Sequence, residues 1–185
     1  MNTAVTSKEE ILKTSRELIR RQGWAAVSIR SVAASCGVSV GSIYNYFDSK
    51  TDLIGATVES VWCEIFHRPE DDAVFQDVQA CVAWMYQRMA YGCERYPGFF
   101  TLHSLGFLRE DKAAGKQRMQ QTWQHILAGL CSVLKQDVRI RPDAFTEQFT
   151  AEKFADVLFS QMLSALLRQD YDPSAVLEIV RRTLY

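Results

Sequence analysis

The spacing of apolar residues in the stretch 28–50 predicts two short helices separated by a glycine turn. Counting from Ile29, apolar residues fall at i, i+3, i+4 and i+7, which makes one face of a helix of about two turns apolar. Ser28 is placed to cap the first amides of this helix, and Gly37 suits the left-handed residue that ends it. This layout is typical of a helix-turn-helix DNA reader.

The second helix carries an outward face of small and amide residues. Ser39 can cap it, and at about 100° per residue Val40, Ile43 and Phe47 point inward. That spacing leaves Gly41, Ser42 and Asn45 on the outer face, with Tyr44 and Tyr46 on its flanks. Short central side chains let a helix approach base edges in the major groove, while longer flanking donors reach the phosphates.

A third helix begins at the end of this stretch. Ser49 is placed as its N-cap, and Asp52 can reach back in a capping box. Lys50 then lies in the first turn, where the helix dipole disfavours a cation. An anion such as a DNA phosphate would therefore suit Lys50 as a partner.

The residues that form this pattern, in order, are Gly23, Ser28, Ile29, Arg30, Val32, Ala33, Gly37, Val38, Ser39, Gly41, Ile43, Tyr44, Asn45, Tyr46, Phe47, Lys50 and Leu53. In this order and spacing, residues 11–53 resemble the N-terminal domain of the tetracycline-repressor (TetR) family of bacterial transcription regulators. The resemblance covers about a quarter of the chain and is far more specific than a single glycine motif. Two departures are mild: Ser28 stands where threonine is commoner, and Asp48 brings a negative charge near the DNA.

The resemblance implies a role for each matching position. Tyr44, Tyr46 and Lys50 match positions that contact DNA phosphates. Ser28 and Arg30, at the start of the first short helix, could add contacts to the DNA backbone. An amide such as Asn45 can pair with adenine, or bind phosphate or water. The predicted DNA-binding residues are Ser28, Arg30, Ser39, Val40, Gly41, Ser42, Tyr44, Asn45, Tyr46 and Lys50.

The rest of the chain reads as longer helices. Apolar residues at helical spacing predict helices at residues 49–67, 73–96, 116–136, 151–168 and 174–184. No stretch alternates as a strand would. The predicted fold is therefore all-α, with a three-helix helix-turn-helix domain at residues 1–50 and a helical effector-binding and dimerisation domain at residues 51–185.

Charge and cysteine content agree with an intracellular DNA-binding protein. Residues 1–50 hold seven Lys+Arg and four Asp+Glu, whereas the whole chain has a net charge of −1. Five cysteines without a C-x-x-C pair argue against a disulfide framework or a zinc site. We interpret each of them as an inert thiol, and the alternative is that one is a redox sensor. No apolar run approaches a membrane span and no signal-peptide core is present, so we expect a soluble cytoplasmic protein without membrane contact.

Aromatic and methionine residues are unusually dense in the middle of the chain. Each could be an ordinary core residue, but so many large polarisable groups also fit a ligand pocket. The resemblance implies a small-molecule cavity in this domain, so we expect an apolar or aromatic effector. The predicted effector-binding residues are Trp84, Tyr86, Met89, Phe100, His103, Phe107 and Trp123.

The last two predicted helices have wide apolar faces. A single chain could bury one such face, and the resemblance favours a homodimer, whose symmetry a palindromic operator requires. The predicted interface residues are Phe154, Leu158, Gln161, Met162, Ala165, Val176, Ile179 and Val180.

The sequence thus predicts a transcription regulator, most often a repressor in such families, that binds palindromic double-stranded operator DNA as a homodimer and responds to a small molecule. No nucleophile-and-base pair, phosphate loop or cofactor motif points to an enzyme, and the three histidines lack close metal-ligand spacing. We therefore expect no cofactor and no metal. The alternative is an all-helical small-molecule carrier or interaction module, which would show no salt-sensitive DNA binding.

Overall fold

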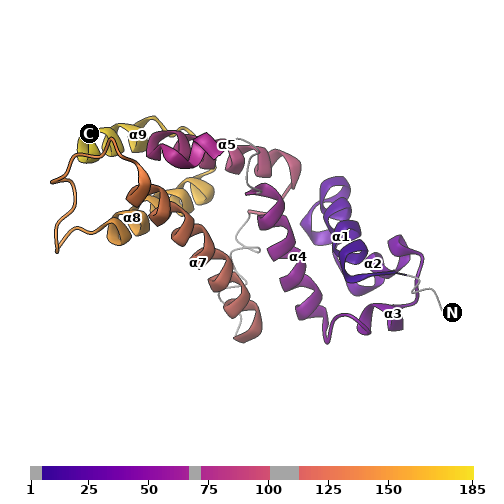
Figure 1. Cartoon of the computed structure of the whole chain (residues 1–185). Helices are drawn as coiled ribbons and strands as arrows, with labels where there is room; N and C mark the ends of the chain where they lie inside the picture. Colours follow the sequence, from indigo (N-terminus) through magenta and orange to yellow (C-terminus); the bar gives the residue numbers. More distant parts are fainter. Residues whose placement is uncertain (1–5, 67–71, 101–112) are drawn as a thin grey trace. The chain divides into compact units, whose positions relative to one another are not determined.

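The computed structural model describes residues 6–66, 72–100 and 113–185, and the regular elements in these ranges are all helices (Figure 1). The predicted all-α fold is confirmed. The chain divides into two compact units. Unit 1 is Met1–Ile65 with Gly92–Gln121, and unit 2 is Phe66–Tyr91 with Thr122–Tyr185. The functional boundary predicted at residue 50 stays a prediction.

Unit 1 holds the helices of the candidate DNA reader. They are α1 (Lys8–Gln22), the 3-10 helix Trp24–Ala26, α2 (Ile29–Cys36), α3 (Val40–Tyr44) and α4 (Lys50–Ile65). Helix α1 packs against α2 and α4, and α2 packs against α3. The core between them consists of fully buried apolar side chains, among them Ile11, Ile19, Ile43 and Leu53.

Unit 2 is built mainly from longer helices. These are most of α5 (Val78–Arg95), which follows the 3-10 helix Asp72–Gln76, and most of α7 (Ala113–Gln136), together with α8 (Ala151–Arg168) and α9 (Ser174–Leu184). Thr150 caps α8 by accepting a hydrogen bond from the Lys153 amide at 3.3 Å. The five predicted long helices, α4 included, are confirmed, but only α8 and α9 have the predicted bounds, and α5 begins at Val78 because the preceding residues form the 3-10 helix.

Gly92 lies where unit 1 leaves no room for a side chain. A Cβ at this position would lie 2.6 Å from Cδ1 of Ile65 and 3.1 Å from Cε2 of Phe100. Both neighbours are buried, so neither can move without disturbing its own packing.

We therefore expect Gly92→Ala to lower the free energy of unfolding by about 1–3 kcal/mol, measured by urea denaturation. Gly129→Ala in α7 is the control, because none of the described residues lies within 4 Å of a Cβ built there. An unchanged stability for Gly92→Ala would show that α4 and α5 can separate freely at this point.

Candidate DNA interface

Helix α2 begins and ends as its sequence predicts. Ser28 accepts a hydrogen bond from the Ser31 amide at 3.1 Å, and the Ser31 hydroxyl accepts one from the Ser28 amide at 2.9 Å. Gly37 ends the helix in the left-handed region, with φ of 67°. The amide of Val38 then donates to Ala33 O at 3.0 Å, which closes the turn that leads to α3.

Helix α3 presents a small exposed face. Ser39 caps it by accepting from the Ser42 amide at 3.1 Å, while Ile43 and Phe47 are buried beneath it. Val40 is 40% exposed and Tyr44 is 49% exposed, so both side chains are open to solvent.

The inward direction predicted for Val40 is wrong. Helix α3 has only five residues, and Val40 is the first of them, so it lies beyond the face that packs against α2. The exposed Val40 methyl groups are instead available to a partner.

Most of the predicted DNA-binding residues lie on the surface. Seven are exposed: Arg30, Ser39, Val40, Gly41, Tyr44, Asn45 and Lys50. Ser28, Ser42 and Tyr46 are half-buried. Asn45 directly follows α3 as its C-terminal cap.

Lys50 occupies the first turn of α4 at a capped helix start. The Asp52 amide donates to Ser49 Oγ at 3.1 Å, and the Asp48 amide donates to Asp52 Oδ2 at 3.1 Å. Ser49 therefore caps α4 as predicted, whereas Asp52 reaches back to the Asp48 amide and not to the Ser49 amide that a capping box would use. The Lys50 side chain is exposed beside the positive end of the helix dipole, so a bound anion would stabilise it there.

Tyr46 has a partner that its spacing did not reveal. Its hydroxyl donates to the carbonyl oxygen of Thr6 at 2.6 Å, 40 residues earlier in the chain. Nearby, Lys8 Nζ lies 5.6 Å from the centre of the Phe47 ring. The residues just before α1 are thus held against the end of α3, and Tyr46 could donate to a phosphate only after releasing Thr6.

The predicted effector-binding residues that the structure describes fall in two units. Phe100 is buried in unit 1, with ring centres 5.5 Å from Trp62 and 4.9 Å from Phe99. Trp84, Tyr86, Met89 and Trp123 belong to unit 2. His103 and Phe107 lie outside the described residues.

In unit 2, Trp84 contacts Phe75 with ring centres 5.5 Å apart, and Tyr86 and Met89 are buried. The rings of Trp123 and Phe159 have centres 5.7 Å apart. The buried indole Nε1 of Trp123 has no hydrogen-bond partner in the described part of the chain. An acceptor on a ligand would satisfy this donor.

Six of the eight predicted interface residues are buried within the chain itself. These are Phe154, Leu158, Met162, Ala165, Val176 and Val180. Gln161 and Ile179 are exposed. The large apolar side chains that α8 and α9 expose are Val157, Leu167 and Ile179, at 46%, 58% and 50%. A second chain that bound at α8 and α9 would therefore meet this second set together with Gln161.

In the described part of the chain, the cysteines and the residue types that bind metals indicate no further site. All five cysteines are free, and burial raises the pKa of Cys81 to about 12. Over the described ranges, no group of three or more His, Cys, Asp or Glu residues could hold a metal ion. Among the described helices, none has the length and apolar character needed to cross a membrane.

The part of the chain that matches a known protein family includes the candidate DNA interface. Residues 11–57 match the family described as bacterial regulatory proteins, tetR family. The chain is 42% identical to the uncharacterized HTH-type transcriptional regulator YerO of Bacillus subtilis over 52 residues. These aligned residues make up 28% of this chain and 18% of YerO. The chain spans half or less of the length of the curated relatives it matches.

Solved structures match over nearly the whole chain. A putative transcriptional regulator from Rhodococcus sp. RHA1 has a TM-score of 0.68 at 14% identity, covering 96% of this chain and 94% of its own. FadR from Bacillus subtilis, solved in complex with stearoyl-CoA, has a TM-score of 0.66 at 16% identity, covering 97% and 100%. At these identities the likeness shows the shared fold.

Proposed function

Because the chain belongs to the tetR family of bacterial regulatory proteins, we propose that it binds a palindromic DNA operator as a homodimer and represses transcription. The observation that carries the proposal is the exposed face of α3. Val40, Gly41 and Tyr44 are open to solvent above a buried Ile43, next to the exposed Lys50. Such a face has a small centre for the major groove and longer flanking groups for the phosphates.

Selection of bound sequences from random duplex DNA tests this proposal. We expect the recovered sequences to share two inverted half-sites, because a two-fold dimer presents two identical readers. A carrier or interaction module would enrich no sequence, and this outcome would overturn the proposal.

Lys50→Ala should weaken binding by about three- to tenfold on every DNA sequence and lower the slope of log affinity against log salt by about one per contact. The physical reason is that the exposed ammonium contributes charge without reading bases. Titrations at several salt concentrations measure both quantities. Lys153→Ala in α8 is the control, since this exposed lysine donates to Gln148 O and should leave DNA binding unchanged. An unaltered salt slope for Lys50→Ala would remove Lys50 from the phosphate contacts.

The homodimer is proposed to form through the exposed apolar residues of α8 and α9. Val157, Leu167 and Ile179 leave apolar surface in water that a second copy would cover. Sedimentation of the purified chain measures the association. A monomer at micromolar concentration would contradict this part of the proposal.

An apolar or aromatic effector is proposed to bind among the aromatic residues of unit 2. The support is the set Trp84, Tyr86, Met89 and Trp123, together with the unpartnered indole Nε1 of Trp123. FadR, which shares the fold, was solved with the long-chain ligand stearoyl-CoA. Thermal unfolding and tryptophan fluorescence with a library of apolar compounds, acyl thioesters included, test this. A library without any response would overturn it.

A further inference from the structure

The segment Gly92–Phe100 belongs to the same compact unit as the candidate DNA reader, although it is distant from the reader in sequence. The first 14 residues of α5, Val78–Tyr91, are in unit 2, whereas its end and the turn that follows are in unit 1. This segment is fixed to α1 and α4 by a polar attachment and an apolar one.

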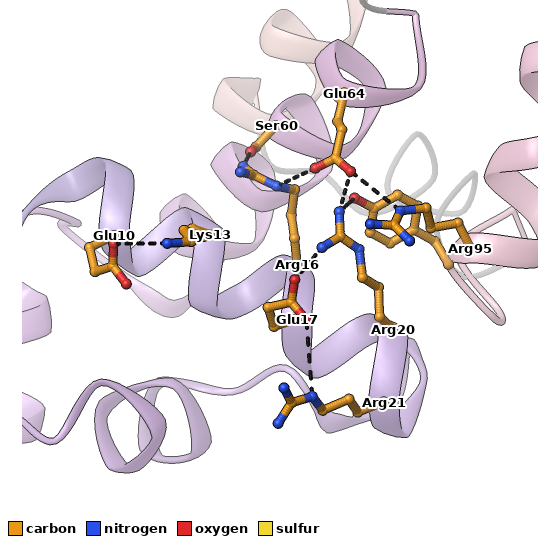
Figure 2. Close-up of polar contacts among 10 residues, drawn as sticks. Glu10, Lys13, Arg16, Glu17, Arg20, Arg21, Ser60, Glu64 and Arg95 are labelled. Atoms are coloured by element: carbon orange, nitrogen blue, oxygen red, sulfur yellow. Dashed lines mark hydrogen bonds and ion pairs between the residues drawn. The ribbon is translucent and has the colours of Figure 1, made fainter.

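The polar attachment centres on Glu64 of α4 (Figure 2). Its carboxylate pairs with Arg16 Nε at 2.8 Å and with Arg20, two arginines on successive turns of α1. Arg95, the last residue of α5, brings its Nε within 3.7 Å of the same carboxylate. Glu64 therefore connects three helices, and its side chain is only 28% exposed.

Tyr96 completes this attachment from inside the unit. It is fully buried, and Arg20 donates to its hydroxyl oxygen at 2.8 Å. Burial acts to raise the pKa of Glu64, but the hydrogen bond from Tyr96 and the charges of Arg20 and Arg16 outweigh it and hold that pKa below its usual range. The Tyr96 hydroxyl thus accepts from α1 and donates to α4.

The apolar attachment joins the turn after α1 to the turn after α5. The Trp24 amide donates to Pro97 O at 3.3 Å, and the Trp24 ring meets Phe99 edge-on with centres 5.7 Å apart. Gly23, with φ of 79°, lies beside this contact, and a Cβ built on it would stand 3.6 Å from Pro97 O. Trp62 of α4 also contacts Phe99, with ring centres 6.2 Å apart.

The polar attachment suits orientation better than stability. Desolvating several charges offsets much of their mutual attraction, so such a cluster adds little net stability. Planar guanidinium groups bind carboxylates in fixed geometries, whereas apolar contacts can slide. Helix α1 packs on both α2 and α4, and α2 packs on α3. The angle between α1 and α4 therefore sets the direction in which α3 faces relative to α4.

We propose that Glu64 and Tyr96 are positioning residues for DNA binding, which hold α1 against α4 and the end of α5 and so set the orientation in which each protomer presents α3. The inference rests on the proposed binding of a palindrome by a homodimer. It also makes the end of α5 one route by which a change in unit 2 reaches the reader, since α5 runs without a break from unit 2 into unit 1.

Tyr96→Phe and Glu64→Gln test the inference, because each keeps the size of the side chain while removing a hydrogen bond or a charge. The DNA probes are the palindrome recovered by selection, the same palindrome with one base pair inserted at its centre, and a duplex of unrelated sequence. We expect each variant to bind the palindrome about five times more weakly than the wild type and to discriminate about five times less against the inserted base pair. Binding to the unrelated duplex should not change.

Tyr91→Phe is the matched control, since it removes a hydroxyl from an exposed tyrosine of the same helix and should leave all three affinities unchanged. Wild-type discrimination between the two spacings in folded Tyr96→Phe would overturn the inference, as would an equal loss on all three duplexes. If Glu64→Gln fails to fold, Tyr96→Phe decides alone. A wild-type chain that binds no palindrome would instead refute the proposed function.

Discussion

Replacing Asp137 by alanine should lower the free energy of unfolding by about 3 kcal/mol. This carboxylate is 1% exposed and follows the end of α7. It accepts hydrogen bonds from the amides of Val78 and Arg139, at 3.1 and 3.0 Å, and from the Tyr185 hydroxyl at 2.5 Å. The Arg139 guanidinium adds two more, at 2.9 and 2.8 Å. Asp137→Ala would leave the buried Val78 amide without its acceptor.

Urea denaturation measures this loss, and the melting temperature should fall by about 6–12 °C. Asp143→Ala is the matched control, because that carboxylate is 85% exposed and meets Arg141 only at 3.4 Å. A surface pair of this kind contributes between zero and about 1 kcal/mol. Similar small losses for both variants would show that the donors around Asp137 find water instead.

The same carboxylate should make stability depend on acid. Burial acts to raise the pKa of Asp137, but hydrogen bonds from Arg139, Tyr185 and the Val78 amide hold that pKa well below its usual range. A lowered folded-state pKa means that the stabilisation is complete above the unfolded value of about 3.9 and is lost as the pH falls toward the folded value. Asp137→Asn should therefore be less stable than the wild type at pH 7, by a margin that shrinks below about pH 4.

The starts of α2, α3 and α8 could be predicted because local chemistry decides them. Ser28, Ser39 and Thr150 cap helices through amides three residues ahead, and Gly37 ends α2 with a backbone conformation that glycine favours. All of this lies within a few residues of sequence. Together with apolar spacing, such signals were enough to predict the all-α fold and the exposure of Gly41, Tyr44 and Asn45.

The polar connections could not be predicted because their partners are far apart in sequence. Tyr46 reaches Thr6 across 40 residues, and Val78 reaches Asp137 across 59. Glu64 lies 44 residues after Arg20. No periodicity marks such pairs, so the sequence alone shows only charged and phenolic side chains that would suit any surface.

Apolar spacing also could not separate the core from an interface. The stripe along α8 and α9 predicted the partner-facing side, yet Leu158, Met162 and Val180 are buried by the chain itself. A helical stripe shows which face avoids water, whereas the element that covers it is decided by tertiary packing. Leu167 and Ile179, on the margins of the stripe, are the residues that stay exposed.

Gly41→Ala should weaken binding to the selected palindrome by roughly 5- to 150-fold while leaving the fold as stable or slightly more stable. Within the described chain nothing requires a glycine here, since a Cβ would lie 3.6 Å from Ser39 Oγ, an ordinary contact. Glycine in a helix is less stable than alanine by roughly 0.5–1 kcal/mol. The missing side chain would instead suit a partner that approaches the backbone closely, as we propose for DNA at α3.

Thermal unfolding and DNA titration measure the two effects, which should have opposite signs. Gly129→Ala is the matched control, because this exposed glycine of α7 also has open space among the described residues, and its replacement should leave DNA affinity unchanged. An added methyl group at a tightly packed interface weakens the binding free energy by about 1–3 kcal/mol, which corresponds to a loss of roughly 5- to 150-fold in affinity. Undiminished binding by Gly41→Ala would mean that DNA stays at least one methyl group away from α3, and base reading would then depend on longer side chains such as Asn45.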